Sequence, residues 1–423
     1  MTDRDALLAA ALADPDDDLP RLALADAVEE AGDPDYAGFV RGQCALAAAP
    51  DWEPVAVAIK HRRPDWVSGQ PWRHLLPPLP PIAAEWHPDR PFRRGLGWCV
   101  VVRDLTAFLQ IADALFDAAQ VGELHLPTAA RSEWQRFAAR PWLPRVRAVR
   151  FYGLGLPIEP VRVLAEADRA TGLEAVTFDH TASPAAGELI GDFLRSLVGK
   201  RLKRLDLRSG YARWTADLAD ALADLPDPPR LDRLGLGMAG LTPPAAERLA
   251  DSPFLDSVTD LDLTLSTELT AAGFKSLFPR DGRPRLRRLT LAGAGLAGRA
   301  SRTIAAGEPF AGLKALDLSD NPRVRPGLGS LFRRLTELRS LKLWRCGIGD
   351  GGLAELVRSP VWPGLVELDL RQNGLTDAGG RSLVAAGGPQ LASLRLGGNP
   401  IGDGVKANLR ATFGDAVDFT ASP

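Results

Sequence analysis

One short phrase of residues returns ten times between Val146 and Leu391 of this 423-residue chain, and it constrains the fold more than any other feature. The phrase is an apolar residue, two variable residues, a second apolar residue, one variable residue and a third apolar residue. The copies begin every 25 to 29 residues, at Val146, Leu173, Leu202, Leu231, Val258, Leu286, Leu313, Leu338, Leu365 and Leu391. Such a period predicts a stack of like units, each of which buries its apolar face against its neighbours.

The copy at Leu365 is complete, with Leu368 and Leu370 as the later apolar residues and Asn373 at the ninth position. This pattern identifies the chain as similar to leucine-rich repeat proteins. Repeats with room for a full helix resemble the ribonuclease-inhibitor-like subclass, over about residues 121–415. The resemblance implies an α/β solenoid, a horseshoe with a parallel sheet on the concave face and helices outside. It also implies protein binding, which is what most members of the subclass do.

Bulk composition narrows the class of protein further. The net charge of −2 disfavours a general binder of nucleic acid or of anionic membranes. Three cysteines, far apart and odd in number, predict neither a disulfide framework nor a zinc site and suit a reducing compartment. The apolar run at residues 6–13 follows acidic residues, unlike a signal peptide. We therefore expect a cytoplasmic monomer that binds a protein partner, and neither nucleic acid nor membrane.

Three regions follow one another along the chain. Residues 1–48 form a small helical module in which acidic residues predominate. Residues 49–95 are a connector rich in proline and tryptophan. Residues 96–423 form the solenoid, with degenerate first repeats to about residue 145 and regular repeats over 146–415. End repeats are expected to be atypical because they close the core.

Four stretches of the first region, residues 8–18, 21–26, 29–33 and 39–44, resemble the bacterial repeat-companion domain, a short module that precedes repeat arrays. The sequence departs from that family around Ala25, where aromatic residues are usual. The excess of 44 arginines over 7 lysines is typical of a GC-rich, bacterial genome. The resemblance implies an architecture and no activity. The module either caps the array or binds a second partner.

The connector has two interpretations. The segment Pro77-Pro-Leu-Pro-Pro81 has the composition of a polyproline II ligand. Four tryptophans favour instead an ordered connector that packs onto the first repeats: Trp52, Trp66, Trp72 and Trp86. In those repeats we predict strands at Cys99–Val102 and at residues 124–126, with a helix over residues 107–119 between them.

Each regular repeat has its own internal design. Ninth-position residues that can hydrogen-bond the backbone of adjacent turns should form a structural ladder: Asn321, Cys346, Asn373 and Asn399. Earlier repeats place Leu154, Thr181, Gly210, Ala239, Ser266 and Ala294 there, which predicts looser geometry. Asp350, Asp377 and Asp403 follow the ladder residues by four and are predicted to be helix N-caps, without a metal ion. Thr242 and Pro243 predict a helix start of the same kind.

The outward strand positions hold the candidate partner-binding residues. Trp344 is flanked by arginine, a composition typical of interface hot spots. The full candidate set is Trp344, Lys342, Arg345, Asp369, Arg371, Arg395 and Tyr152. Two alternatives stay open: Trp344 packs over Arg371 and Ser319 as surface filler, and neighbouring aspartates and arginines neutralise one another.

Catalytic motifs are missing from the sequence. The five histidines fall in no metalloprotease spacing, and Gly293 and Gly295 lie in a repeat turn. Cys346 is expected to be a buried thiol, and Cys44 and Cys99 have no partner nearby in the sequence to activate them. We expect no enzyme, no cofactor and no metal. The main hypothesis is a non-catalytic scaffold that binds a protein on its concave face; the alternative is a GTPase activator that supplies Arg323 or Arg325 in trans.

Overall fold

The computed structural model describes residues 3–153, 158–179, 186–208, 216–238, 241–250, 252–278, 285–388 and 390–421. The chain divides into two compact units. Unit 1 comprises Met1–Gly153 and Pro157–Val176, and unit 2 comprises Leu154–Leu156 and Thr177–Pro423. The boundaries predicted at residues 48 and 95 stay predictions. None of the helices in these described ranges is long and apolar enough to span a membrane.

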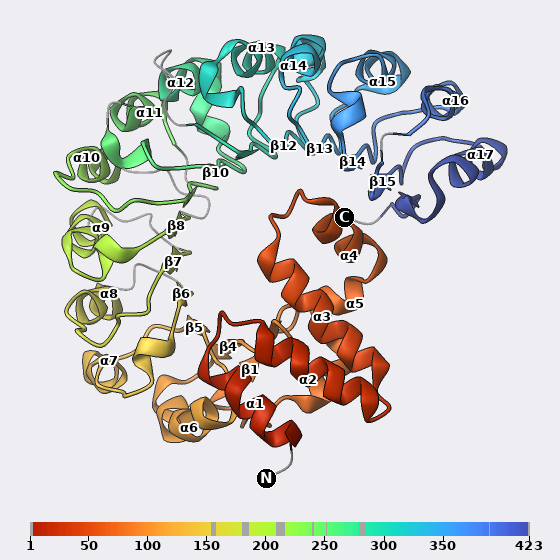
Figure 1. Ribbon diagram of the computed structural model, residues 1–423. Coiled ribbons are helices and arrows are strands. Elements are labelled where there is room, and N and C mark those ends of the chain that lie inside the picture. Colours follow the sequence, from red (N-terminus) through yellow and green to blue (C-terminus); the bar gives the residue numbers. More distant parts are fainter. Residues whose placement is uncertain are drawn as a thin grey trace. The chain divides into compact units, whose positions relative to one another are not determined.

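Unit 1 combines a helical segment with the first strands of a sheet (Figure 1). Its helices are α1 (Asp3–Ala13), α2 (Leu19–Glu30), α3 (Pro34–Ala48), α4 (Pro54–Arg62), α5 (Pro64–Ser68), α6 (Leu105–Ala118), α7 (Arg131–Ala138) and α8 (Ile158–Ala165). Its strands are β1 (Ala84–Trp86), β2 (Phe92–Arg93), β3 (Leu96–Gly97), β4 (Cys99–Val102), β5 (Glu123–Leu126) and β6 (Ala148–Phe151). The strands β4, β5 and β6 are parallel, and β1 runs antiparallel beside β4. The strands and helix predicted over residues 99–126 are confirmed.

The helical segment of unit 1 has its own apolar core. Leu24 and Val28 of α2 and Phe39 of α3 belong to it, together with Trp72 of the 3-10 helix η1 (Gln70–Leu75). The rings of Phe39 and Trp72 stack with centroids 4.1 Å apart. The prediction that the connector tryptophans pack onto the first repeats is wrong for Trp72, and for Trp66, whose ring lies against α3 at Gly42. Both tryptophans cover the helices because α3 offers them a surface of small and aromatic side chains.

Two buried arginines hold the acidic loop between α1 and α2. Arg21 is fully buried, and its guanidinium donates to the carbonyl oxygens of Ala11 and Asp14 at 2.8 and 2.9 Å. These acceptors are at the carboxyl end of α1, where helix carbonyls lack partners within the helix. Arg94 forms an ion pair with Asp18. The loop's negative charge is therefore partly neutralised inside unit 1.

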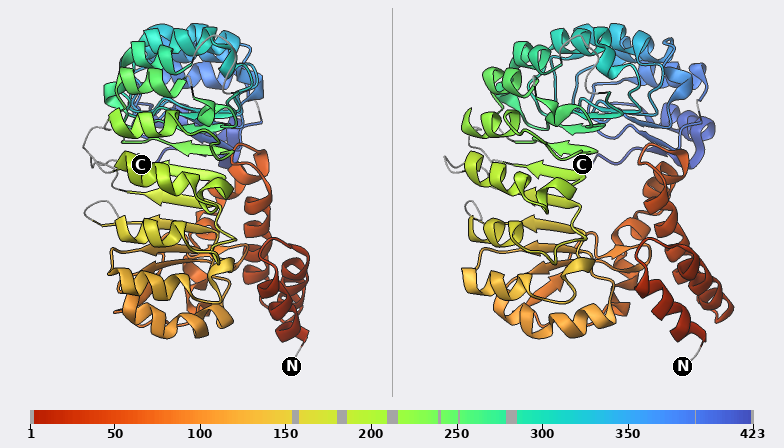
Figure 2. Two further views of the ribbon diagram at one scale, coloured as in Figure 1. Left: turned by 90° about the vertical axis from the view of Figure 1, so that its left-hand side faces the viewer. Right: turned by 60° about the vertical axis from the view of Figure 1, so that its left-hand side comes forward.

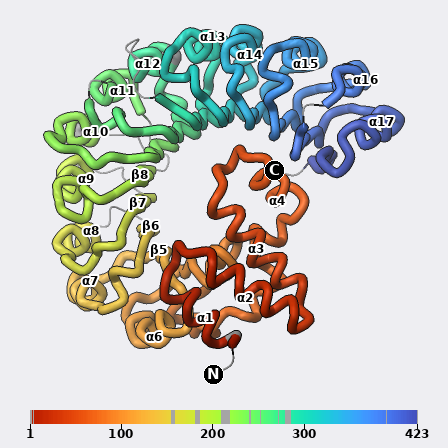
Figure 3. Tube along the Cα trace, in the orientation of Figure 1, coloured from red at the N-terminus to blue at the C-terminus, as the bar shows by residue number. Residues whose placement is uncertain are grey.

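Unit 2 repeats one strand and one helix per turn of the chain, as the tube in Figure 3 shows. The strands after β7 (Ala175–Phe178), which spans the unit boundary, are β8 (Arg204–Leu207), β9 (Arg233–Gly235), β10 (Asp260–Asp262), β11 (Arg288–Thr290), β12 (Ala315–Asp317), β13 (Ser340–Lys342), β14 (Glu367–Asp369), β15 (Ser393–Arg395) and β16 (Val417–Asp418). The helices are α9 (Ala186–Arg195), α10 (Ala216–Ala223), α11 (Pro243–Ala250), α12 (Thr270–Leu277), α13 (Gly298–Ala306), α14 (Leu328–Arg334), α15 (Gly349–Val357), α16 (Asp377–Ala386) and α17 (Asp403–Phe413). Within this unit the strands line the inner side of an arc and the helices the outer side (Figures 1 and 2).

Short 3-10 helices lead into or follow many of these elements. They are η2 (Leu143–Arg145), η3 (Gly199–Arg201), η4 (Pro253–Leu255), η5 (Thr267–Leu269), η6 (Glu308–Phe310), η7 (Arg325–Gly327), η8 (Trp362–Gly364) and η9 (Gly414–Ala416). The fold is an α/β leucine-rich repeat solenoid.

The predicted repeat register is confirmed strand by strand. From β6 to β15, each strand begins two residues after the first apolar residue of its phrase. The parallel pairing places the second apolar residues side by side, as with Leu341 and Leu368. Leu368 and Leu370 are fully buried, as predicted. Burial of each such leucine stabilises the fold by roughly 1.5–3 kcal/mol, which makes this row the main apolar core of unit 2.

A ladder of polar side chains links consecutive repeats beneath the turns. Asn373 is buried and accepts from the backbone N–H groups of Cys346 and Ile348, at 3.1 and 3.3 Å. Its amide donates to the carbonyl oxygen of Leu343 at 2.7 Å. Asn321 and Asn399 make equivalent bonds, and the buried Cys346 thiol donates to the Leu318 carbonyl at 3.1 Å. Backbone groups that the strands leave unpaired are thereby satisfied.

The ladder positions of the earlier repeats form fewer hydrogen bonds than the asparagines do, as their residue types predict. Ser266 is buried and its hydroxyl donates to the Leu236 carbonyl at 3.1 Å, a single bond in place of the several that asparagine makes. Ala294 is buried and has no polar side chain. The positions at Leu154, Thr181, Gly210 and Ala239 lie outside the described residues.

The N-cap prediction is wrong for the three aspartates. The N-caps are Ile348, Thr376 and Gly402, and each aspartate lies in the first turn of its helix. Asp350 instead accepts from the N–H and hydroxyl of Thr376 in the next repeat, at 2.9 and 2.6 Å. Asp377 likewise accepts from Gly402 N–H at 2.7 Å. An aspartate in the first turn suits the helix dipole, and here its side chain also joins two repeats. The start predicted at Thr242 is confirmed, with Pro243 as the first residue of α11.

We expect Asn373→Ala to destabilise unit 2 by about 3 kcal/mol, because two buried N–H groups lose their acceptor. Asn399→Ala is the matched control, and about 1 kcal/mol is expected there because its half-buried site admits water. Urea unfolding followed by circular dichroism measures both. If the two variants lose the same unfolding free energy, burial of the ladder side chain does not determine its contribution to stability.

Candidate functional site

The candidate surface is formed by the outward residues of β12 to β15 and by the turns that follow these strands. The eighth residue of each phrase adopts a left-handed backbone conformation, with φ of 59° at Asp320, 54° at Arg345 and 52° at Gln372. This conformation costs a residue with a side chain roughly 1–2 kcal/mol. The parallel register therefore aims three polar side chains from equivalent turns along one edge of the sheet.

Two guanidinium groups lie close to the indole ring of Trp344. The central carbon of Arg345 is 5.5 Å from the indole centroid and that of Arg371 is 5.8 Å away. The indole is half-buried, and its buried N–H has no hydrogen-bond acceptor within the described part of the chain. The packing of Trp344 with Arg371 agrees with the alternative in which the indole only fills the surface over its neighbours. The exposed Arg345 keeps one side of the cluster accessible, with 52% of its side-chain surface exposed.

Charged residues around Trp344 pair with their neighbours across the strands. Lys342 lies 3.6 Å from the Glu367 carboxylate, and Arg345 lies 3.3 Å from that of Asp320. In the sheet register, the fifth positions of five successive strands alternate in charge: Asp317, Lys342, Asp369, Arg395 and Asp418. Pairs of this kind contribute roughly 0–1 kcal/mol each when exposed, and they lower the net field of the surface.

Asp369 and Arg371 have a structural function that the sequence did not reveal. Both are buried, and their side chains form an ion pair of 2.6 Å. The Asp369 carboxylate also accepts from the Arg371 N–H at 3.1 Å. Aspartates at three equivalent positions accept from the N–H two residues later in the same way: Asp262, Asp317 and Asp418. The recurrence of aspartate at the fifth position was the available signal, and it marks a turn.

The remaining candidate residues lie apart from the Trp344 cluster. Arg395 pairs in register with Asp369 on the next strand and is half-buried. Tyr152 lies in unit 1, where its hydroxyl donates to the Val102 carbonyl at 2.5 Å. Burial raises the pKa of the Tyr152 phenol. Tyr152 therefore holds β4 and the turn after β6 together within unit 1.

The middle of the sheet face is also internally paired. Arg233 lies 2.9 Å from Asp260 and 3.3 Å from Asp262, and Arg288 lies 3.5 Å from Asp260. Burial raises the pKa of the Asp260 carboxyl, and the nearby arginines oppose that shift. These contacts match the alternative in which aspartates and arginines neutralise one another.

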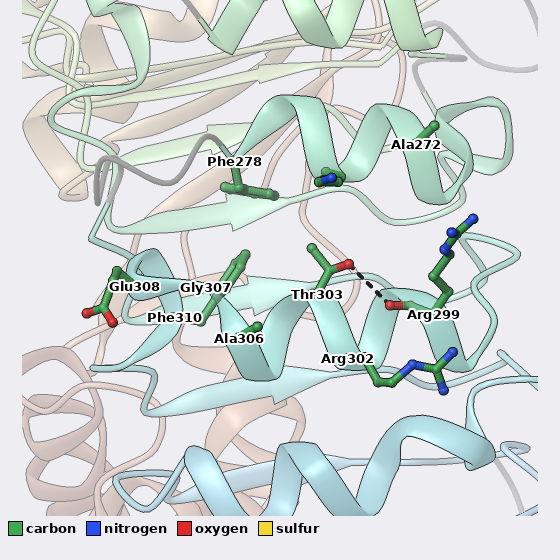
Figure 4. Close-up of a pocket in the computed structure, with 10 residues that line it drawn as sticks. Ala272, Phe278, Arg299, Arg302, Thr303, Ala306, Gly307, Glu308 and Phe310 are labelled. Atoms are coloured by element: carbon green, nitrogen blue, oxygen red, sulfur yellow. Dashed lines mark hydrogen bonds between the residues drawn. The ribbon is translucent and has the colours of Figure 1, made fainter.

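A hollow of about 1010 Å³ lies on the helical side, between α12, α13 and η6 (Figure 4). Buried Phe278 and Phe310 form part of its lining. The cationic side chains Lys275, Arg299 and Arg302 are exposed. Small-molecule sites usually have a few polar groups that converge inside the cavity, and exposed cations on separate helical turns do not provide that arrangement.

Comparisons with known proteins identify the repeat. A family model described as Leucine Rich repeat matches residues 365–384, which span β14 and most of α16. No curated protein is significantly similar in sequence.

Several solved structures match the chain at low similarity. The chain is 15% identical to a chain of the yeast Rad7–Elc1 complex, with a TM-score of 0.49 over 95% of this chain and 93% of that chain. A Bacteroides fragilis protein is 13% identical, with a TM-score of 0.35 over 70% and 74% of the two chains. A leucine-rich repeat protein of Leptospira interrogans is 14% identical, with a TM-score of 0.22 over 71% and 90%. Similarities at this level say nothing about the function of this chain.

Titration of Asp317 gives a testable consequence of the crowded sheet face. Burial raises the pKa of its carboxyl above the ordinary value, so ionisation penalises the folded state. The penalty is absent below the unfolded pKa of about 3.9 and grows as the pH rises through the folded pKa. Asp317→Asn keeps an oxygen to accept from Ser319 N–H, so we expect its stability relative to wild type to increase from pH 3 to pH 7.

Chemical unfolding at several pH values measures this difference. Asp232→Asn is the control for loss of a negative charge, because Asp232 is exposed and lies outside the helices. The stability of Asp317→Asn relative to wild type should rise with pH. If this difference in unfolding free energy stays constant or falls, the pKa of Asp317 is not raised in the folded protein.

Proposed function

We propose that this protein is a non-catalytic scaffold that binds a partner protein through the outward face of its repeat strands, at the surface around Trp344. The observation that supports the proposal most strongly is the half-buried indole held beside Arg345 and Arg371. Tryptophan and arginine are the residues most enriched at interface hot spots. In the middle of the described strand face, Arg233 and Arg288 pair with Asp260.

Preorganisation supports the same surface. Arg345 is directed by a left-handed turn, and the buried Asp369–Arg371 pair supports the indole from the next repeat. Side chains that are already ordered lose less conformational entropy on binding, so more of the contact energy appears as affinity. We propose Trp344, Arg345 and Lys342 as contact residues, with the more distant Arg395 as a further contact and Asp369 and Arg371 as supports.

The decisive variant removes the Trp344 indole and the exposed guanidinium of Arg345. Trp344→Ala with Arg345→Glu should lower partner affinity by roughly thirtyfold or more, the effect of losing a hot spot of 2 kcal/mol. Arg371→Glu is unsuitable because it would place two carboxylates in one buried pair. Arg299→Glu makes the same charge change at an exposed position on the helical side and serves as the control.

A photo-crosslinker at position 342 of the full chain identifies the partner in a lysate of the source organism, and the purified partner is then titrated against each variant. We expect the control to bind like wild type and the Trp344 variant to lose binding. If wild type, the Trp344 variant and the control bind the partner equally well, the binding site lies elsewhere on the protein.

A second candidate function is stimulation of a GTPase by an arginine supplied in trans. It is favoured by the position of Arg323 and Arg325, which are both exposed in the connection between β12 and α14. Arg323→Ala with Arg325→Ala should then abolish any acceleration of GTP hydrolysis by the crosslinked partner, while binding is retained. A hydrolysis rate that the wild-type protein does not change excludes this candidate.

A further inference from the structure

Three side chains with metal-ligating atoms meet on the strands of unit 1. Cys99 of β4 is the register partner of Glu123 on β5, and His125 follows two residues later on the same strand. The alternate residues Val100, Leu124 and their neighbours are buried in the apolar core. Side chains alternate between the two faces of a strand, so Cys99, Glu123 and His125 share the opposite, outward face.

The ligand atoms of these side chains lie within 4.8 Å of one another. The Cys99 Sγ is 3.7 Å from the His125 Nε2, and that nitrogen is 2.9 Å from a carboxylate oxygen of Glu123. Tetrahedral zinc, with Zn–S of about 2.3 Å and Zn–N of about 2.0–2.1 Å, holds its sulfur and nitrogen ligands about 3.6 Å apart. The observed separation of sulfur and nitrogen fits this geometry, and the carboxylate oxygen has to move about 0.5 Å away from the His125 Nε2 for both to bind the ion.

The cluster is enclosed and oriented by the segment that follows β1. Cys99 and His125 are buried, and the His87 ring meets that of His125 edge to face with centroids 5.0 Å apart. The His87 Nδ1 accepts from the N–H groups of Asp89 and Arg90, at 3.2 and 3.3 Å. These bonds fix the His87 ring beside the ligands.

Two arginines bring positive charge to the cluster: Arg90, and Arg150, which is the register partner of His125 on β6. The Arg90 guanidinium lies 2.8 Å from the Glu123 carboxylate and 3.4 Å from the His125 Nε2. Just over half of the Arg90 side-chain surface is exposed, at 52%. The side chain can therefore swing into solvent when a stronger cation takes its place.

We propose that Cys99, Glu123 and His125 form a binding site for a zinc ion. Thiolate, imidazole and carboxylate together form a donor set that zinc favours, whereas calcium and magnesium prefer oxygen alone. Three protein ligands leave the fourth tetrahedral position to water. The ion joins β4 to β5.

Binding has a defined proton balance. The thiolate is the form of cysteine that binds zinc, so the Cys99 thiol must lose its proton when the ion is bound. The ion displaces the thiol proton and any proton on the His125 Nε2, and these pass to the buffer. With thiolate and carboxylate as ligands, the charge of the divalent ion is neutralised. Affinity must therefore rise with pH.

Cobalt(II) titration of the full chain, purified without a histidine tag and stripped with a chelator, tests the site directly. Wild type should bind one cobalt ion per chain, with a thiolate-to-cobalt charge-transfer band and the visible bands of tetrahedral coordination, and zinc should displace it. Cys99→Ala should abolish the charge-transfer band, and Glu123→Gln should weaken binding roughly tenfold or more. Proton release on zinc addition is read with a pH indicator dye.

Cys44→Ala is the matched control, since Cys44 is a buried thiol in the helical core of the same unit. It should keep the wild-type spectrum. A wild-type titration without a charge-transfer band, or a band that survives Cys99→Ala, overturns the proposal and leaves a hydrogen-bonded cluster. If Cys99→Ala does not fold, Glu123→Gln decides: cobalt affinity equal to wild type overturns the site.

Discussion

The backbone polar groups in the turn after each strand are the constraint on which unit 2 depends. The strands are only three residues long from β9 to β15, so the chain leaves the sheet within a buried region. Burying an unpaired N–H group costs roughly 1–3 kcal/mol. Asn321, Asn373 and Asn399 remove that cost because each accepts from the preceding repeat and donates to its carbonyl groups. Stacking in register is therefore a requirement of hydrogen bonding as well as of leucine packing.

The same turns shape the outward surface. A left-handed residue follows the strand, and an aspartate at the fifth position can accept from the N–H two residues later. Charges then face one another across adjacent strands, and most of the described sheet face is neutralised internally. A partner gains little from charges that are already paired, because their attraction to each other must be given up. The half-buried Trp344 escapes that limitation, because contact with its indole ring does not require an ion pair to break.

The sequence predicted the structure correctly where a single interaction, such as leucine burial, explains the residue pattern. It failed where the same residue type at the same position can serve two different contacts. Leucine spacing gave strand positions from β6 to β15 because each phrase has one register that buries its apolar residues. Asp350 was predicted to cap its own helix. In the sequence, an aspartate that caps a helix cannot be told from one that accepts hydrogen bonds from the next repeat. The bonds of Asp350 to Thr376 depend on the distance to the next repeat. Trp66 and Trp72 were assigned to the wrong neighbour for a related reason, since burial of an indole does not name what covers it.

The sequence by itself determined the repeat, its register and the residues that line the core, because a period of two along a strand leaves only one face for the leucines. It also determined that the ladder residues are polar. The tertiary structure alone decided which outward side chains meet. Cys99 is separated along the chain from Glu123 and His125, and only parallel pairing of β4 with β5 brings their ligand atoms within 4.8 Å. Shifting that pairing by one residue would turn the thiol or its partners to the opposite face, so their proximity is a property of the sheet.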